Sequence, residues 1–417
     1  MPPSTIAKAN ARTANPSAAG TGPALVVIML GLLLGLQPLA TDMYLPSLPS
    51  IQAGFGAPVS QAQLTLTAFL LAFGCSQVVW GPLSDRIGRR PVLLVGLAGY
   101  VIAAIGCGSA QSMEALIGWR AVEGASLGAG VMCARAVVRD LYAPHLGAQV
   151  MSKALTGLGM LAFTAPILGS VLVNTLGWRS TMFASACMGA CAWLMVLLKF
   201  QESLPAPNPQ ALQLGSLART WARILRNPTF QAYNLLTCFT YAGLFTLLAS
   251  SSFTFINVLG MSRTQYGLMM SGYALCYISG TVLCRRLLAR MPVQRAVAWA
   301  GLASLASGTL LGLAALAELR SVWAYIPSFC VFQIAHGVHM PCGQSNAVGP
   351  FPQAAGTASA LNGVMMMLMA FAMGHWLGLT LDGSSTRPMG YGLWFWGACT
   401  ALVAWTLVRR HGRPAHA

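Results

Sequence analysis

The chain has 417 residues, of which 56% are hydrophobic and only 8% are charged. Soluble domains carry about 25% charged residues, so the composition excludes an ordinary water-soluble fold and favours a lipid bilayer. The formal charge of +16 does not indicate a nucleic-acid partner, because the basic residues form no stripe with interleaved aromatic side chains.

The N-terminal stretch, residues 1–23, is rich in Ala, Pro, Ser, Thr and Asn and contains Lys8 and Arg12. This composition predicts a disordered cytoplasmic tail. A cleaved signal peptide is the alternative, but the hydrophobic run that follows is long, and Asp42 inside it would make a poor export signal.

From residue 24 onwards the chain contains repeated windows of about 20 apolar residues, each long enough to cross a membrane. Backbone polar groups in lipid must be satisfied within the segment itself, so these windows are predicted to be helices. The twelve expected spans are 24–45, 61–82, 92–110, 113–135, 150–173, 180–199, 229–253, 264–284, 293–316, 322–344, 356–377 and 389–408.

Residues 201–228 form the longest hydrophilic stretch and contain the sequence LPAPNPQ. The stretch follows six spans and precedes six more. We interpret it as a cytoplasmic linker between two six-helix bundles, 24–200 and 229–408, with a second cytoplasmic tail at 409–417. Its Pro and polar residues prevent one continuous helix, so the two bundles can move relative to each other.

The positions of the basic residues predict the orientation. Of the 24 Lys and Arg residues, Arg120 lies inside a span, and only Arg179, Arg263, Arg320 and Arg387 fall in the loops on one side. The positive-inside rule therefore places the other side, with both termini, in the cytoplasm. The expected location is a bacterial inner membrane.

The loop between the second and third spans, GPLSDRIGRRPVLL at 81–94, concentrates four charged side chains. With twelve spans in a six-plus-six arrangement, this loop resembles the signature G-x-L-(S/A)-D-R-x-G-R-(R/K) of the major facilitator superfamily. The matching residues are Gly81, Leu83, Asp85, Arg86, Gly88, Arg89 and Arg90.

Four further stretches resemble the drug:proton antiporters of the Bcr/CflA type. They are TDMYLPSLP (41–49), RAVEGASLGAGVMCARAVVRDLY (120–142), APILGSVLVNTLGWRSTMF (165–183) and FPQAAGTASALNG (351–363). The resemblance implies an all-α membrane protein of two pseudo-symmetric six-helix bundles. It also implies proton-coupled multidrug efflux of small, mostly lipophilic compounds by alternating access.

In the resembled family the loop acts as a latch between the two bundles. Asp85 is expected to point at the free amides of a helix that begins near Gly356, where the helix dipole leaves about half a positive charge. This contact would lock the outward-open state. The pseudo-symmetric loop, GTVLCRRLLARMP (280–292), has Cys284 in place of the acid, so the latch is expected to be one-sided.

The remaining residues of the loop at 81–94 are expected to lie at the surface or to shape the backbone. Arg86, Arg89 and Arg90 are expected on the cytoplasmic surface near anionic lipid, Gly88 permits a tight turn, and Gly81 allows close helix approach. The alternative is that RIGRR is only a positive-inside anchor and its neighbouring acid a surface counter-ion.

Only Asp42 and Glu123 among the eight acids fall inside or near the bilayer. A charged side chain at the centre of a membrane helix costs about 2.5–3.5 kcal/mol on the insertion scale, so such residues are rarely idle. Asp42 follows Pro38, which can kink the helix. The resemblance links an acid in this motif to protonation and substrate binding; a helix-end acid in interfacial water is the alternative.

Arg120 and Glu123 lie three residues apart on one face of the fourth span. An arginine in the membrane keeps its proton and therefore needs an anion or water. Arg120 matches the superfamily arginine associated with proton transfer, whereas Glu123 replaces the usual glutamine. Glu123 could pair with Arg120 or act as a second proton site, and a purely structural role for both is a further alternative.

The fifth span matches the antiporter signature only partly. Pro166 and Gly169 fit it, while Leu161, Ala165 and Ser170 stand where glycines are usual. The resemblance implies that this helix seals against proton leak; an ordinary Pro-kinked helix is the alternative.

Promiscuous drug sites use Met, aromatic and a few polar side chains that repack around varied ligands. The candidates here are Tyr44, Tyr241, Phe245, Tyr273, Gln333, His336 and Asn362. Packing or contact with lipid is the alternative for each of them.

No phosphate-binding loop of the G-x-x-x-x-G-K-(S/T) kind occurs, which argues against an ATP-driven pump. No nucleophile–base set indicates an enzyme, and the Cys and His spacings indicate no metal site. We expect a monomer without a cofactor. A proton-coupled exporter of a native metabolite, such as an amino acid, short peptide or nucleoside, is the alternative function, and a channel or receptor would need neither latch nor embedded acid.

Overall fold

The computed structural model describes residues 23–142, 144–204, 214–351, 354–381 and 385–412. The tail expected at 1–23 therefore lies almost wholly outside the described residues. The Pro-rich part of the linker, 205–213, and the end of the second tail, 413–417, lie outside them as well.

Twelve long helices make up most of the described chain, and each overlaps one of the twelve predicted spans. They are α1 (Pro23–Asp42), α3 (Val59–Ile87), α4 (Arg89–Ser109), α5 (Met113–Leu141), α6 (Pro144–Leu176), α7 (Arg179–Lys199), α9 (Pro228–Ser252), α10 (Arg263–Leu288), α11 (Val293–Leu316), α12 (Ile326–Val348), α13 (Ala355–Thr380) and α14 (Arg387–Trp405). Shorter elements are η2 (Leu45–Ser47), α2 (Leu48–Phe55), α8 (Leu214–Leu225), η3 (Phe253–Val258), η4 (Val322–Ala324) and α15 (Leu407–His411). The predicted all-α membrane fold is confirmed.

Three helices run at least five residues past the predicted ends of their spans. Helix α3 continues to Ile87, α5 continues to Leu141, and α6 begins at Pro144. The added turns carry charged residues such as Asp85 and Arg139, which an apolar window leaves out although the backbone stays helical.

Eleven described helices are long and apolar enough to cross a membrane. Helix α12, with 23 residues, is long enough but carries Gln333, His336 and His339 along one stretch. These three side chains are buried, so protein rather than lipid surrounds the polar part of this helix.

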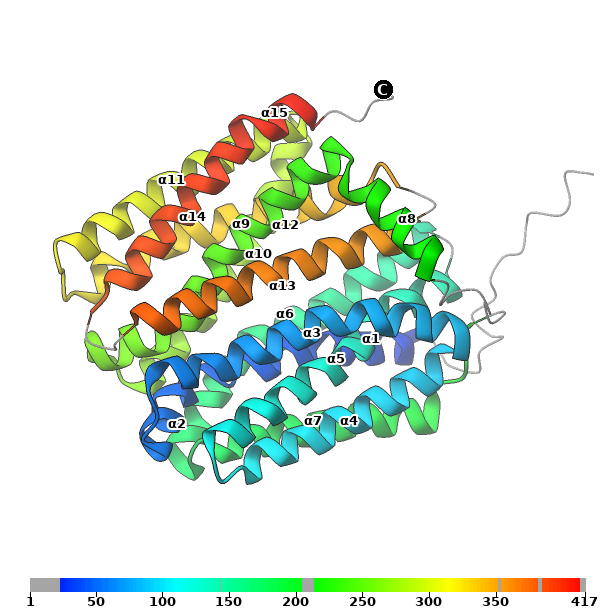
Figure 1. Ribbon diagram of the computed structural model, residues 1–417, viewed down its shortest axis with the longest axis horizontal. Helices are drawn as coiled ribbons and strands as arrows, with labels where there is room; N and C mark the ends of the chain where they lie inside the picture. Colours follow the sequence, from blue (N-terminus) through cyan, green and yellow to red (C-terminus); the bar gives the residue numbers. More distant parts are fainter. Residues whose placement is uncertain (1–22, 143, 205–213, 352–353, 382–384, 413–417) are drawn as a thin grey trace, which may run out of the picture.

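The long helices lie side by side along one direction, and α2 and α8 mark the two ends of the bundle (Figure 1). We call these the α2 end and the α8 end. The helices fall into a first group, α1 and α3–α7, and a second group, α9–α14. Within the first group α3 packs on α5 and α1 on α6, and within the second α11 packs on α14 and α10 on α12. The groups meet where α3 packs on α13 and α6 on α10.

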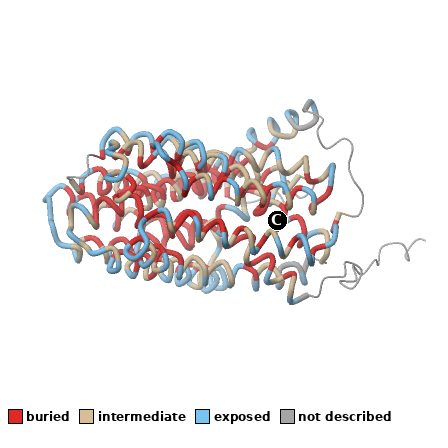
Figure 2. The backbone as a smooth tube through the Cα atoms, turned by 90° about the horizontal axis from the view of Figure 1, so that it is seen from below, coloured by how far each residue is buried: buried red, intermediate tan, exposed pale blue. Residues whose placement is uncertain are grey.

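Burial follows the inner sides of the helices, whereas exposed positions lie along the outside of the bundle (Figure 2). Large apolar side chains more than half exposed include Val95, Ile102, Leu198, Leu310, Leu379 and Leu402. Apolar side chains spread over the whole outer surface are suited to lipid, so this chain is a multi-pass membrane protein.

Hydrogen bonds join the two groups in the part of the bundle nearer α2. They run from Gln63 Nε2 to Ala249 O (2.5 Å), Arg263 Nη2 to Ser50 Oγ (2.8 Å), Asn174 Nδ2 to Thr264 Oγ1 (3.2 Å) and Ser271 Oγ to Phe163 O (2.6 Å). Contacts of this kind hold the α2 end together across the boundary between the groups.

Candidate functional site

A fully buried ion pair lies within α5. Arg120 Nη1 is 2.8 Å from Glu123 Oε2, and neither side chain has exposed surface. A spacing of three residues puts both on one face of the helix, which is why the pair can form without help from another element. Of the alternatives that the sequence leaves open for Glu123, the ion pair is the arrangement in this structure.

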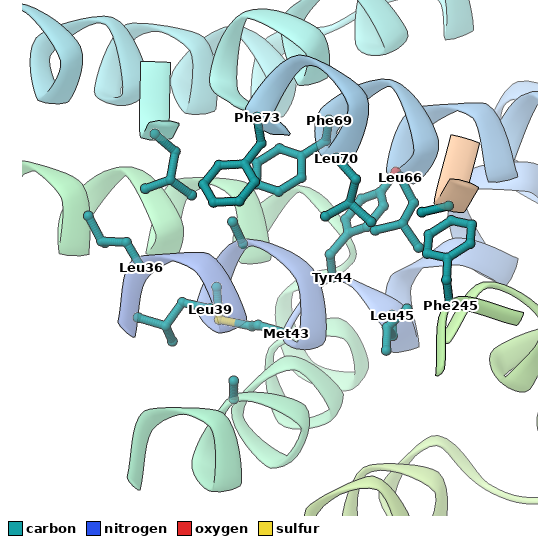
Figure 3. Close-up of a cluster of buried hydrophobic side chains, with 14 of the residues drawn as sticks. Leu36, Leu39, Met43, Tyr44, Leu45, Leu66, Phe69, Leu70, Phe73 and Phe245 are labelled. Atoms are coloured by element: carbon teal, nitrogen blue, oxygen red, sulfur yellow. The ribbon is translucent and has the colours of Figure 1, made fainter. Parts of the chain in front are cut away.

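Arg120 also connects α5 to α1 and α3. Its Nη2 donates a hydrogen bond to Ala40 O over 3.1 Å. Its guanidinium carbon lies 4.4 Å from the ring centre of Tyr44 and 4.3 Å from that of Phe69. Figure 3 shows Tyr44, just beyond α1, lying against α3 in the same apolar cluster as Phe69. Desolvated cation–π contacts stabilise by about 2 kcal/mol or more, so these rings help to hold the charge.

The ion pair leaves two buried atoms free. Among the described side chains, Arg120 Nε and Glu123 Oε1 have no hydrogen-bond partner. Cys107 Sγ lies 3.6 Å from the other carboxylate oxygen, Oε2. Glu123 therefore keeps one oxygen that can accept a proton or a water molecule.

Asp42 is the last residue of α1 and is half-buried. Its Oδ1 accepts a hydrogen bond from Thr41 Oγ1 over 2.9 Å. The η2 turn, three residues after Asp42, packs on α9 and α10 of the second group. Asp42 is thus close to the boundary between the groups, and the predicted cavity residue Tyr241 belongs to α9 of the facing group.

One turn of α6 contacts helices of both groups. Pro166 lies inside α6, which continues as one helix from Pro144 to Leu176. A Cβ added at Gly169 would collide with the carbonyl oxygen of Met43, and one added at Gly267 of α10 would collide with Ser170 Oγ. The small residues at these positions let α6 approach α1 and α10 closely.

The charged loop between α3 and α4 forms an ion-pair network within the first group. Arg89 Nη1 lies 2.6 Å from Asp85 Oδ1, and Arg89 Nε lies 2.9 Å from Asp140 Oδ2. Arg89 Nη1 also donates to Ser84 Oγ over 2.6 Å. The prediction that Arg89 stays on the surface is wrong: its side chain is 2% exposed, because two carboxylates and a hydroxyl compensate the buried guanidinium.

Asp85 has a second, longer contact with Arg139 Nη2, at 4.0 Å. A Cβ added at Gly356, near the start of α13, would lie 3.9 Å from Arg139 Nη1. Arg139 therefore approaches both the acid of the loop and the helix that Asp85 is predicted to reach in the outward-open state.

Sequence reasoning missed the role of Glu202, which holds the loop to the start of the linker. Its carboxylate accepts hydrogen bonds from the backbone amides of Arg89 (2.9 Å) and Arg90 (3.0 Å), which begin α4. Acids are favoured at helix N-termini, and Glu202 comes from more than a hundred residues away. Gly88 has φ +106° there, a conformation that favours glycine, and a Cβ would collide with the same carboxylate.

The remaining loop residues are less constrained. Arg86 is exposed, and Arg90 is partly exposed and donates from Nη2 to Leu197 O over 3.0 Å. The close helix approach predicted at Gly81 is absent from this structure. An added Cβ would find its nearest neighbour, Met132 Sδ, 4.0 Å away, because a flexible side chain rather than a backbone faces it.

The predicted cavity residues divide into two sets. Tyr44 and Phe245 have no exposed surface and belong to the apolar core, in keeping with the packing alternative (Figure 3). Tyr44 also shares a hydrogen bond of 2.6 Å with Thr65 Oγ1. These two rings therefore stabilise the contact between helices in this structure.

A polar set lies in the second group, on α10, α12 and α13. It comprises Tyr273, Gln333, His336 and Asn362, all buried. His336 Nδ1 lies 2.9 Å from Thr240 Oγ1, and Asn362 Oδ1 accepts from Thr237 Oγ1 over 2.8 Å. The hydroxyl of Tyr273 and Oε1 of Gln333 have no partner among the described residues, so they can bond a ligand.

Comparison with known proteins places the chain among transporters. The sequence model of the Major Facilitator Superfamily matches residues 30–374. The bicyclomycin resistance protein homolog of Haemophilus influenzae is 27% identical, over 90% of this chain and 93% of its own. Multidrug resistance protein D of Escherichia coli is also 27% identical, over 81% and 84%.

Solved structures share the same fold. The xylose transporter XylE of E. coli, in a partially occluded inward-open conformation, superposes with a TM-score of 0.73 over 94% of this chain and all of its own. Its sequence is 13% identical. Both relatives are named as resistance proteins, in agreement with the drug:proton antiporter family that the sequence motifs predict.

Proposed function

Because the chain belongs to the Major Facilitator Superfamily, we propose that it is a proton-coupled multidrug efflux antiporter for small, mostly lipophilic compounds. The names of its resistance-protein relatives support export of drugs. The observation that carries proton coupling is the placement of two acids, Asp42 and Glu123, inside the first group near or within the membrane. Ionisable residues there are expensive and mark proton or substrate pathways.

We place the α8 end in the cytoplasm of a bacterial cell and the α2 end outside its inner membrane. The loops at the α8 end hold most of the basic residues, and the described chain begins in α1 and ends in α15 on that side. The hydrogen bonds at the α2 end then close the outer side in this structure. Opening must break those contacts while the α8 end closes.

Asp42 is the proposed site of proton exchange. It lies three residues before the η2 turn that packs on α9 and α10, close to the boundary between the groups, where its carboxylate can meet either a proton or a cationic part of a substrate. Competition between the two for one carboxylate gives antiport, because a drug leaves when a proton binds. The unpartnered hydroxyl and amide oxygen of Tyr273 and Gln333 supply neutral contacts on the opposite side.

The Arg120–Glu123 pair is the proposed support for this site. Arg120 holds the carbonyl of Ala40 and the ring of Tyr44, which lie two residues before and two residues after Asp42. A change in the charge of Asp42 therefore acts on a segment of α1 that is fixed on both sides to α5. Glu123 keeps Arg120 neutralised and has one oxygen free for a proton.

The test is drug export measured in inside-out membrane vesicles, in which accumulation of a fluorescent lipophilic cation follows the pH gradient. Each elementary charge moved across 100 mV supplies about 2.3 kcal/mol, so a protonophore should abolish accumulation. Accumulation that persists with the gradient and potential collapsed, but requires ATP, would overturn the proposal.

Asp42→Asn is expected to abolish proton-coupled export while the protein stays folded, because the change is nearly isosteric and removes only the titratable group. Glu114→Gln, at an exposed acid in the first turn of α5, is the matched control and should export like the parent. If Asp42→Asn is folded and exports normally from pH 6 to pH 8, about the range in which buried carboxyls titrate, coupling must lie elsewhere.

A further inference from the structure

The second group has a groove on its outer surface, between α11 and α14, at the α8 end. It measures about 240 Å³ and is lined by Arg295, Ala298, Trp299, Leu302 and Trp405. Four of these residues lie on one stripe of α11 with helical spacing, and the fifth is the last residue of α14. The groove faces away from the boundary between the groups and takes no part in the transport site proposed above.

One end of the groove is charged, and the rest of the groove is lined by apolar side chains. Arg295 is exposed in the first turn of α11, where the helix leaves the loop at the α8 end. Further along, Trp299 is 62% exposed and Leu302 is 45% exposed. Trp405 closes the opposite wall, and its Nε1 donates to Ala298 O over 3.0 Å, which fixes the indole in place. Indole rings favour the membrane–water interface because they are apolar with one polar group.

Arg295 forms no ion pair with any residue that the structure describes. From residue 203 to the end of the chain the sequence contains only two acids, Glu318 and Asp382. Glu318 pairs with Arg387, where α14 begins, at the α2 end. Asp382 follows α13, which ends on that same side. Among the described side chains, the α8 end of the second group therefore holds arginines and no carboxylate.

From this combination we infer that the α11–α14 groove binds an anionic phospholipid of the leaflet at the α8 end. The headgroup phosphate pairs with Arg295, and one acyl chain lies over Trp299, Leu302 and Trp405. Basic pockets between membrane helices bind lipid phosphates in this way. The two indole rings of the groove hold the acyl chain in a defined position. The inference depends on the membrane placement of the chain and is independent of what the protein transports.

The test of the headgroup contact uses the full-length protein in detergent, titrated with phosphatidylglycerol or with phosphatidylcholine of the same acyl chains, and native mass spectrometry to count bound lipids. The parent should bind phosphatidylglycerol more tightly. Arg295→Gln should weaken phosphatidylglycerol about fivefold, the effect of one basic residue at a membrane surface, and should weaken phosphatidylcholine less, because the choline cation offsets the charge of its phosphate.

Arg290→Gln is the matched control, because Arg290 is an exposed arginine between α10 and α11 that does not line the groove. It should bind both lipids like the parent. Equal losses in the two variants would show diffuse attraction to a basic surface and overturn the site. Equal binding of both lipids by the parent would overturn the anionic headgroup.

Trp299→Ala tests the acyl-chain contact and should weaken both lipids, whereas Trp323→Ala, at a 77% exposed tryptophan of η4 on the other side of the membrane, should weaken neither. Unchanged lipid binding in Trp299→Ala would overturn the proposed position of the acyl chain over Trp299. The same spectra report mass: a parent dimer that Trp299→Ala converts to a monomer without lipid loss would assign the groove to a second copy instead.

Discussion

At the scale of single residues, the buried pair of α5 contributes to stability and has a proposed role in proton coupling. Arg120 and Glu123 have no exposed surface, and each compensates a charge that the apolar interior would otherwise reject. Removing one partner of such a pair leaves an uncompensated charge, whereas removing both together does not.

Arg120→Leu is therefore expected to destabilise the protein by about 3–5 kcal/mol. The double variant Arg120→Leu/Glu123→Leu should recover much of this loss, because no charge stays unpaired. Thermal unfolding in detergent measures both. A single variant as stable as the double one would show that Glu123 is already neutral in the parent.

Glu123→Gln separates the two roles left open for this acid. The glutamine keeps a carbonyl oxygen near Arg120 but carries no exchangeable proton, and it is the residue usual in the resembled family. If Glu123 only supports Arg120, the variant retains substantial export in the same vesicles. Loss of coupling in a folded Glu123→Gln protein would make Glu123 a proton site.

At the scale of elements, close backbone contacts set how α6 packs. Gly169 lies against the backbone of Met43 in α1, and the neighbouring Ser170 lies against Gly267 in α10. Since α1 carries Asp42 and α10 belongs to the second group, this turn of α6 contacts both sides of the transport site.

Gly169→Ala is expected to push α1 away from α6 and destabilise the protein by about 1–3 kcal/mol, the usual cost of overpacking. Gly159→Ala is the control on the same helix, because its nearest neighbour would lie 3.9 Å from the added Cβ. The control should be neutral or slightly stabilising, since alanine favours a helix more than glycine does. Equal thermal stability of the two variants would contradict this account of α6.

At the scale of the whole molecule, the loop network and the α2-end contacts describe one of the two states that the proposed antiport requires. Asp85 and Arg89 both belong to the first group, so their ion pair can persist when the groups move. Only a contact of Asp85 with the start of α13 would differ between states. A variant that lacks the Asp85 carboxylate should therefore change the balance between the two states only through the contact with α13.

Asp85→Asn is expected to favour the state closed at the α2 end. The lost contact with a helix N-terminus is worth about 0.3–1 kcal/mol, or about two- to fivefold in the equilibrium. The measurement is thiol labelling of Ala249→Cys in a cysteine-free chain, because Ala249 is buried at the α2 end beside Gln63. Labelling should slow in Asp85→Asn and not in Asp85→Glu. Equal rates in all three would leave Asp85 a surface counter-ion.

The sequence by itself determined the helices and the family, because both depend on local information. A bilayer requires a fixed length of apolar chain, and each predicted span reappears as a long helix. The spacing of Arg120 and Glu123 placed them on one face, since partners three residues apart meet within a helix.

The tertiary structure decided which distant groups compensate one another. Arg89 looked like a surface anchor, yet Asp140 and Asp85 bury it, and Glu202 at the end of the first group holds the start of α4. No local pattern signals the contacts with Asp140 and Glu202, because these partners lie 51 and 113 residues away from Arg89. The groove of Arg295 likewise exists only because α11 and α14 pack side by side, so that a charge and two indoles from separate helices line one surface.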